Sequence, residues 1–186
     1  ADRIRLGPLT MVKFSLLDPI EAAVQRRLHD AIHTDVLTGV HNRRYLATRL
    51  RDEFAASMRH RRELCLLLLD IDNFKQINDA QGHPVGDIVL RALASELMEL
   101  VRAEDVVVRY GGEEFLIVAR ELMPAQGQEF GERLRSGVQA KPVVLPGGVQ
   151  VPITISVGLA NLRGGRDNDA EAVITRADAA LYQAKR

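Results

Sequence analysis

The chain has 186 residues, with 25 lysines and arginines against 25 aspartates and glutamates. This length predicts one domain of ordinary size plus a short extra segment. With 46% hydrophobic and 27% charged residues, the composition excludes disordered, collagen-like and fibrous proteins. A formal net charge of zero argues against binding to a nucleic acid polymer, because neutralising several phosphates requires a basic surplus, although a local basic patch is compatible with it.

Membrane and export signals are absent from the sequence. The longest apolar run, Leu64 to Leu69, is far shorter than the roughly 20 residues that cross a bilayer. The N-terminus lacks the order of a secretory signal, and the single cysteine, Cys65, has no partner for an internal disulfide, which favours a reducing cytoplasm. The chain begins with Ala1 rather than Met, so we expect a piece of a longer protein, whose full length is compatible with a membrane anchor.

Residues 1–33 are expected to be an N-terminal segment that continues from an upstream region. Residues 1–17 show no sustained period, and Asp18-Pro19-Ile20-Glu21 then predicts a helix start, with Asp18 as the N-cap and Pro19 in the first helical position. The helix should run to about His33. Its narrow apolar stripe suits either pairing with a second helix or packing on its own domain.

The remaining elements mix helices with hairpins. We predict helices after Asn42, from Pro84, over Pro124–Val138, and after a cap at Asn168 with Glu171. Strands are predicted over residues 64–69, 106–109, 115–119, 143–145, 149–151 and 153–159, with hairpin turns at 110–114 and 146–148. Strict alternation of strand and helix is absent, so an α+β fold with a mainly antiparallel central sheet flanked by helices is favoured over a Rossmann fold.

Acidic residues stand at the ends of the predicted strands. Asp70 and Asp72 follow the apolar strand, and Glu113 and Glu114 lie at a turn that begins with two glycines. If these strands are neighbours, the acids meet at one sheet edge, where their repulsion calls for protons or a hard cation such as Mg²⁺. Single acids at loop ends are usually just solvated, but glycines in the turn allow a ligand to approach the backbone closely.

Other phosphate and metal motifs are missing. There is no Gly-x-x-x-x-Gly-Lys-Ser/Thr loop, no Gly-x-Gly-x-x-Gly fingerprint and no His-Glu-x-x-His motif. The five histidines are scattered, and with one cysteine they do not form a zinc cluster at the usual spacings. Cys65, inside the apolar strand, is expected to be a core residue.

Several blocks of sequence resemble the GGDEF family of diguanylate cyclases. They are Asp35-Val36-Leu37-Thr38-Gly39-Val40-His41-Asn42-Arg43-Arg44, Asp70-Ile71-Asp72-Asn73-Phe74-Lys75-Gln76-Ile77-Asn78-Asp79, Gly82-His83, Gly86-Asp87, Gly111-Gly112-Glu113-Glu114-Phe115 and Ala177 to Lys185. The resemblance covers about residues 34–186, in the expected order and spacing. It implies a catalytic domain on a fold similar to the palm of nucleotide cyclases and polymerases, preceded by a signalling helix. The family's closing Gly-Arg-Asn stretch, whose Arg meets phosphate, is not reached.

The resemblance implies an enzyme that condenses two GTP molecules into cyclic di-GMP and releases two pyrophosphates in the bacterial cytoplasm. Two Mg²⁺ or Mn²⁺ ions per active site would be held by Asp70, the carbonyl of Ile71 and Glu113, and Glu114 would assist as a ligand or in activating the 3′-hydroxyl. Substrate contacts would come from Asn78 and Asp87 at the guanine, from Lys75 and Lys185 at the phosphates, and from Phe74, Gly111 and Gly112 beside the nucleotide.

The guanine-binding roles have a chemical rationale and simpler alternatives. Asp87 accepts hydrogen bonds, as the N1–H and N2 amino edge of guanine requires, so it favours GTP over ATP. Asn78 would otherwise turn the chain after a short helix, and Asp87 would complement the dipole in the first turn of the next one.

A second site is predicted at Arg102 and Asp105, which fit the family's Arg-x-x-Asp motif for inhibition by the product. An arginine forks onto phosphate or guanine, and an aspartate accepts from the guanine edge; the simpler alternative is an ion pair after a helix end. Arg133 or Arg135 would supply a further cation.

Each domain has one nucleotide site, while the product has two linkages, so a homodimer is expected, controlled by an upstream sensor through the stalk helix. The alternatives left open are a receptor that binds GTP or cyclic di-GMP without turnover, and a nucleotidyl cyclase with a different product.

Overall fold

The computed structural model describes residues 2–5, 11–14, 18, 20–21, 23–24, 32–162, 167 and 169–186. The chain divides into two compact units, Ala1–Ile32 and His33–Arg186. No helix within the described ranges is long and apolar enough to cross a membrane.

The first unit contains a strand pair that the sequence did not predict. Strands β1 (Asp2–Arg5) and β2 (Met11–Phe14) are antiparallel. Each has four residues, too few for an alternating pattern to stand out. Residues 20–21 and 23–24 are helical, and the N–H of Ile20 donates to Oδ1 of Asp18 at 3.0 Å, as the predicted cap requires. Most of the predicted helix from Asp18 to His33 lies outside the described residues, so its pairing stripe stays a prediction.

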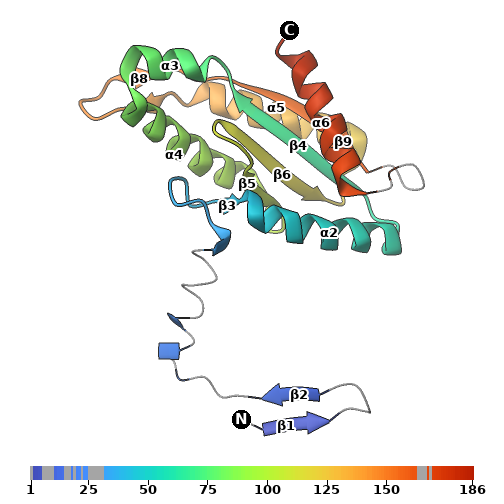
Figure 1. Ribbon diagram of the computed structural model, residues 1–186. Helices are drawn as coiled ribbons and strands as arrows, with labels where there is room; N and C mark the ends of the chain where they lie inside the picture. The colour runs from blue at the N-terminus through green and yellow to red at the C-terminus, as the bar shows by residue number, and fades with distance from the viewer. Residues whose placement is uncertain are drawn as a thin grey trace. The chain divides into compact units, whose positions relative to one another are not determined.

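The second unit is built on a five-stranded sheet in the order β3-β5-β6-β4-β9 (Figure 1). These strands are β3 (His41–Asn42), β5 (Val106–Arg109), β6 (Glu114–Arg120), β4 (Leu64–Ile71) and β9 (Ile155–Asn161). Neighbouring strands are antiparallel except β3 and β5, which are parallel. The predicted α+β class with a mainly antiparallel sheet is confirmed. A separate hairpin, β7 (Val143–Val144) and β8 (Gln150–Val151), is also present.

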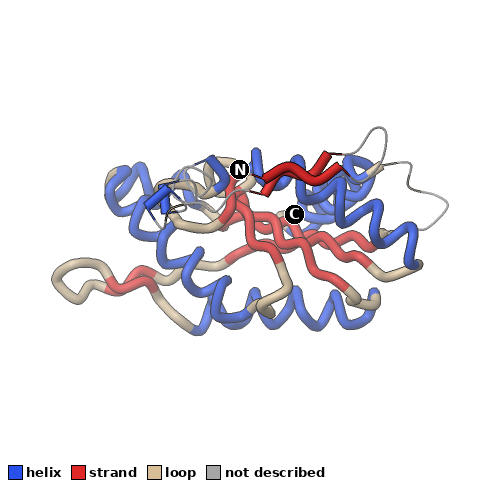
Figure 2. The backbone as a smooth tube through the Cα atoms, turned by 90° about the horizontal axis from the view of Figure 1, so that it is seen from below, coloured by secondary structure: helices blue, strands red, loops and turns tan. Residues whose placement is uncertain are grey.

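Helices cover both faces of the sheet (Figure 2). Helices α4 (His83–Leu100) and α5 (Pro124–Ala140) contribute to one hydrophobic cluster, and α2 (Arg43–His60) and α6 (Ala170–Ala184) contribute to the other. The short helix α3 (Phe74–Gln81) packs against α4. The sheet is therefore the middle layer of three.

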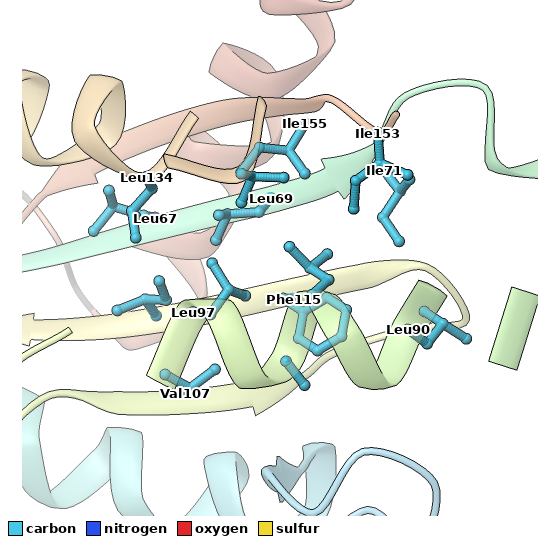
Figure 3. Packing of buried hydrophobic residues seen from close by; sticks show 14 of the residues in the cluster. Leu67, Leu69, Ile71, Leu90, Leu97, Val107, Phe115, Leu134, Ile153 and Ile155 are labelled. Atoms are coloured by element: carbon cyan, nitrogen blue, oxygen red, sulfur yellow. The ribbon is translucent and has the colours of Figure 1, made fainter. Parts of the chain in front are cut away.

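Strand β4 shows why its sequence is a continuous apolar run. All eight residues are buried. Leu67 and Leu69 belong to the α4 and α5 cluster, whereas Leu66 and Leu68 belong to the α2 and α6 cluster. Figure 3 shows Leu67 and Leu69 in one cluster with Phe115 of β6. A strand covered on both faces needs apolar side chains at every position, so alternation is lost.

Two predicted helix boundaries are corrected. Asp169, rather than Asn168, is the N-cap of α6, because its Oδ1 accepts from the N–H of Ala172 at 2.9 Å. Helix α4 begins at His83, and its first turn contains no acidic residue, so Asp87 lies in the second turn. Gly82, with φ +86°, both ends α3 and precedes α4, which places the start of α4 earlier than Pro84 alone suggests.

Candidate functional site

The carboxylates expected at one sheet edge come from adjacent strands. Asp70 lies near the end of β4, and the β4–β6 register places it directly opposite Glu114, the first residue of β6. Glu113 precedes Glu114 in the turn that follows β5. The structure thus brings residues that are more than 40 positions apart to one end of the central strands. We call Asp70, Glu113 and Glu114 at this end the acidic edge.

Burial and mutual repulsion govern the electrostatics of this edge. Asp70 is only 6% exposed. The pKa of Glu113 is raised, first by burial and then by the negative charge of Asp70, with Glu114 acting in the same direction. The positive charge of Lys185 opposes the shift. An additional cation would therefore be bound favourably between Asp70 and Glu113.

Asp72 does not join the acidic edge but fixes the backbone beside it. Its Oδ2 accepts from Oγ1 of Thr154 at 2.6 Å, its Oδ1 accepts from Oγ of Ser156 at 2.7 Å, and its N–H donates to the Thr154 carbonyl at 3.0 Å. Successive residues of an antiparallel strand direct their backbone groups to opposite sides. Because Asp72 bonds toward β9, the carbonyl of Ile71 faces the β6 side, on which Glu113 lies.

Helix α6 brings a lysine to the buried aspartate. A Cβ at Gly158 of β9 would lie 2.2 Å from the backbone nitrogen of Leu181, so only glycine lets α6 pack this closely on the sheet. Nζ of Lys185, just after the end of α6, lies 2.7 Å from Oδ1 of Asp70. This oxygen is buried and has no hydrogen bond of regular geometry in the part of the chain that is described.

These residues fit a divalent cation that shares its ligands with a substrate. No group of three or more His, Cys, Asp or Glu side chains in the described ranges is arranged to hold a metal ion by itself. Mg²⁺ usually takes one or two carboxylates and completes its shell with water and phosphate oxygens. Asp70, Glu113 and the Ile71 carbonyl provide such a partial set, with an Asp70 oxygen that lacks a regular hydrogen bond.

The turn between β5 and β6 is held by Arg109, which sequence reasoning missed. Its guanidinium donates to the carbonyl of Gly112 at 2.7 Å and to Oδ1 of Asp35 at 3.2 Å. Burial opposes ionisation of Asp35, but hydrogen bonds from Thr38 and then Arg109 lower its pKa overall. Asp35 belongs to one of the sequence blocks that resemble the GGDEF family. The need of this acid for a basic partner is the signal that could have pointed to Arg109.

The two glycines of this turn have different roles. A Cβ at Gly111 would lie 2.3 Å from Oε2 of Glu114, whereas a Cβ at Gly112 would have no atom within 4 Å. Gly111 therefore makes room for the Glu114 carboxylate, and the open space expected for a nucleotide lies beside Gly112. The N–H groups of Tyr110 and Gly111 both donate to the Glu114 carbonyl, at 2.8 and 3.2 Å.

The residues expected to bind guanine, Asn78 and Asp87, lie on α3 and α4. Asn78 is inside α3, not after it, and Asp87 is an exposed residue of α4. A Cβ at Gly86 would lie only 2.0 Å from Oδ1 of Asn78 and 3.2 Å from Cζ of the buried Phe74. Gly86 thus allows the Asn78 side chain to lie against α4, a requirement that the sequence pattern alone did not reveal. Lys75 is exposed on α3.

Arg102 and Asp105 line a pocket of about 130 Å³ together with Arg133 of α5. Arg133 stacks on Phe130, 4.7 Å from the ring centroid. Arg135 does not line this pocket, and its guanidinium is paired with Glu132 at 2.7 Å. The geometry therefore favours Arg133 over Arg135, the choice that the sequence left open.

Arg102 and Asp105 are not joined by a side-chain ion pair. Instead, Oδ2 of Asp105 accepts from the backbone N–H of Arg102 at 3.0 Å. Burial raises the pKa of Asp105, and the Arg102 N–H and charge oppose that rise. The direct ion pair of the simpler alternative is therefore not seen between these two side chains, although the charge of Arg102 still acts on Asp105 at longer range.

Comparison with known proteins shows which family the chain resembles. Residues 32–186 match the model of the family described as "Diguanylate cyclase, GGDEF domain". The chain belongs to this family. It is 44% identical over 154 residues to diguanylate cyclase DgcP of Pseudomonas aeruginosa and 42% identical over 153 residues to the response regulator PleD of Caulobacter vibrioides. Each alignment covers 82% of this chain but only 22% of DgcP and 34% of PleD, so the chain spans about a third or less of the length of these relatives.

Solved structures of the family share the fold. The coiled coil and GGDEF domain of DgcB from Caulobacter crescentus, in complex with c-di-GMP, matches with a TM-score of 0.82 and 30% identity over 89% of this chain and 86% of that one. Diguanylate cyclase SiaD from Pseudomonas aeruginosa, in complex with its activator SiaC, matches with a TM-score of 0.80 and 38% identity over 90% and 63% of the two chains. The palm-like GGDEF fold is thereby confirmed.

Proposed function

We propose that this chain is a diguanylate cyclase that condenses two GTP molecules into cyclic di-GMP with release of two pyrophosphates. The observation that carries the proposal is the acidic edge, where Asp70 opposes Glu114 across two strands and the pKa of Glu113 is raised by burial and by Asp70. Membership of the GGDEF family and relatives named diguanylate cyclases support it. A protein that only bound nucleotide would not need this set of carboxylates.

Asp70, Glu113 and the carbonyl of Ile71 would hold two Mg²⁺ or Mn²⁺ ions, with Glu114 beside them. When bound, these ions would stabilise the charge on the attacking 3′-oxygen, on the α-phosphate and on the departing pyrophosphate. Glu114, whose carboxylate lies next to Gly111, would assist removal of the 3′-hydroxyl proton. Lys75 and Lys185 would bind phosphate oxygens.

Asn78 and Asp87 would select the base. The amide of Asn78 lies against α4 because Gly86 has no side chain, and Asp87 is exposed on the same helix. Guanine presents N–H donors that Asp87 would accept, whereas adenine lacks this donor pair. A site built on these bonds should reject ATP by several kcal/mol, on the order of 2–5, because its polar groups would be left unpaired.

The reaction requires two chains. One domain presents one acidic edge, and the product contains two 3′,5′ linkages, so two domains would face each other with antiparallel GTP molecules. The segment before residue 34 would set this encounter in response to an upstream sensor in the full-length protein. Product would bind at Arg102, Asp105 and Arg133 and inhibit the enzyme.

The test is incubation of the full chain with GTP and Mg²⁺, with products separated by chromatography. Cyclic di-GMP and pyrophosphate are expected in a ratio of one to two, with a rate that rises faster than linearly with protein concentration. GTP that is bound but unconverted at high protein concentration would show a receptor instead. A mononucleotide or mixed product would show a different cyclase. Omission of Mg²⁺ and replacement of GTP by ATP should each abolish product.

A further inference from the structure

The ion pair between Lys185 and Asp70 occupies the oxygen that the proposed function assigns to a metal. Nζ of Lys185 lies 2.7 Å from Oδ1 of Asp70, whose side chain is 8% exposed. The lysine side chain is 39% exposed and follows the last turn of α6. One partner is thus fixed and buried, while the other reaches in from the surface.

A buried carboxylate needs a counter-charge. Removing one partner of a buried pair is strongly unfavourable, because an uncompensated charge is left in a poorly solvated place. Asp70 also raises the pKa of Glu113, so the need for positive charge extends to both acids. Lys185 is the cation that meets this need here, and it acts on Asp70 by contact and on Glu113 at longer range.

An ammonium group and a divalent cation that contact the same carboxylate oxygen repel each other strongly, since the two positive charges lie a very short distance apart. A metal ion that binds alone therefore competes with Lys185 for this oxygen, and Lys185 loses its contact with Asp70 without gaining a phosphate partner. A metal ion that arrives with a triphosphate brings anionic oxygens to which the displaced ammonium can transfer. Displacement of Lys185 is thus compensated best when nucleotide is present.

We propose that Lys185 is an exchangeable counter-ion, which neutralises Asp70 while the metal is absent and transfers to the triphosphate when metal and nucleotide bind. This inference rests on the proposed function, in which Asp70 is a metal ligand and Lys185 contacts phosphate. Its consequence is a positive coupling between metal and nucleotide binding. Lys185 opposes binding of the metal without nucleotide, but it favours binding of metal and nucleotide together.

The position of Lys185 suits such an exchange. The close packing at Gly158 fixes the height of α6 above the sheet, so the lysine stem starts from a defined point. Its four-carbon chain and compact, strongly hydrated charge allow the ammonium to change partners without movement of the helix.

The experiment is calorimetric titration of the full chain with Mn²⁺ in the absence of nucleotide, which requires no turnover. Lys185→Met should bind Mn²⁺ roughly tenfold more tightly than the wild type, because the competitor is gone. Lys185→Arg keeps a cation and should remain within about twofold of the wild type. Arg91→Met is the matched control: it removes one positive charge from an exposed residue of α4 that has no proposed role in the site, and it should leave the affinity unchanged.

A second titration measures the coupling. With a non-hydrolysable GTP analogue present, the gain in Mn²⁺ affinity should be smaller for Lys185→Met than for the wild type. Nucleotide-free Mn²⁺ affinity that is equal or weaker in Lys185→Met than in Arg91→Met would overturn the counter-ion role. Absence of cyclic di-GMP from the wild type with GTP would instead contradict the proposed function, and the nucleotide-free titration distinguishes the two failures.

Discussion

The two ends of strand β5 present opposite chemistry. Arg102 and Asp105 lie just before Val106, where Arg133 adds a second cation, whereas the turn after Arg109 presents Glu113 and Glu114 beside Asp70. A strand of four residues spans about 13 Å, so the two regions are close in space. In the proposed function, a guanine nucleotide would bind at both regions, but the acidic edge would hold its phosphates through a cation, while the pocket would bind them directly through guanidinium groups.

Burial raises the pKa of one carboxylate in each region, Asp105 and Glu113, but the groups that offset this rise differ. Asp105 accepts a hydrogen bond from the N–H of Arg102, and its charge is thereby partly satisfied by the protein itself. For Glu113, the charges of Asp70 and Glu114 add to the effect of burial, with Lys185 opposing them. The pocket therefore presents two guanidinium groups beside a carboxylate that the backbone partly satisfies, whereas the acidic edge is left in need of a cation.

The largest expected effect comes from breaking the acidic edge with Glu113→Gln. The substitution removes a metal-binding charge without changing packing, so turnover of GTP should fall by at least about a hundredfold. The measurement is the initial rate of cyclic di-GMP formation by chromatography. Glu121→Gln removes the same charge from an exposed pair with Arg62 and is the matched control; a similar loss in this variant would contradict the assignment.

The same variant has a stability signature. Because the pKa of Glu113 is raised in the fold, the protein loses stability as the pH rises through that raised pKa, and Gln removes this loss. Without metal, thermal unfolding of Glu113→Gln at neutral pH should occur at a temperature equal to or above that of the wild type. The difference should vanish when the pH falls below the ordinary range of a glutamate.

Gly86→Ala should impair base recognition next most strongly. The new Cβ would lie 2.0 Å from Oδ1 of Asn78 and would force that side chain to move. We expect KM for GTP to rise on the order of tenfold or more, with a smaller change in kcat. In an Asn78→Ala background the same substitution should have little further effect on KM; an equal effect in both backgrounds would show that Gly86 acts only through helix packing.

Measurements of product inhibition should distinguish the role of the pocket lined by Arg102, Asp105 and Arg133 from that of the acidic edge. Arg133→Ala and Arg102→Ala should each raise the cyclic di-GMP concentration that gives half-inhibition by about tenfold or more, because each removes a guanidinium that lines the pocket. Arg135→Ala removes a guanidinium from the same helix that is paired with Glu132 and should leave inhibition unchanged. Equal shifts in Arg133→Ala and Arg135→Ala would show only a general effect of charge.

Sequence pattern predicted the elements well where burial is one-sided or complete. The continuous run at β4 and the glycine turn between β5 and β6 are both confirmed. The strand pair β1 and β2 was missed because its strands are too short to show a period.

Within the site, local pattern identified the acids but not what holds them in place. The bonds from Asp72 to Thr154 and Ser156 join segments more than 80 residues apart, and the contact of Arg109 with Asp35 spans 74 positions. Likewise, the reasons for Gly86 and Gly158 appear only when neighbouring helices pack. Such long-range contacts are set by the tertiary fold, and local spacing does not encode them visibly.

The smallest expected effect concerns the contact of Asp35 with Arg109, which holds the turn between β5 and β6. Asp35 binds Arg109 and Thr38, so Asp35→Asn should lower the free energy of unfolding at neutral pH by about 1–2 kcal/mol. Since the pKa of Asp35 is lowered in the fold, its contribution is present above the ordinary aspartate range and is lost as the pH falls through the lowered pKa. Urea unfolding at several pH values measures this: the wild type and Asp35→Asn should converge in acid. The exposed Asp79→Asn is the control, and an equal loss of stability in that variant would show only a general effect of charge.

If Asp35→Asn also lowers the rate of cyclic di-GMP formation while the fold remains intact, the guanidinium of Arg109 positions the turn as well as stabilising it, because it links Asp35 directly to the Gly112 carbonyl.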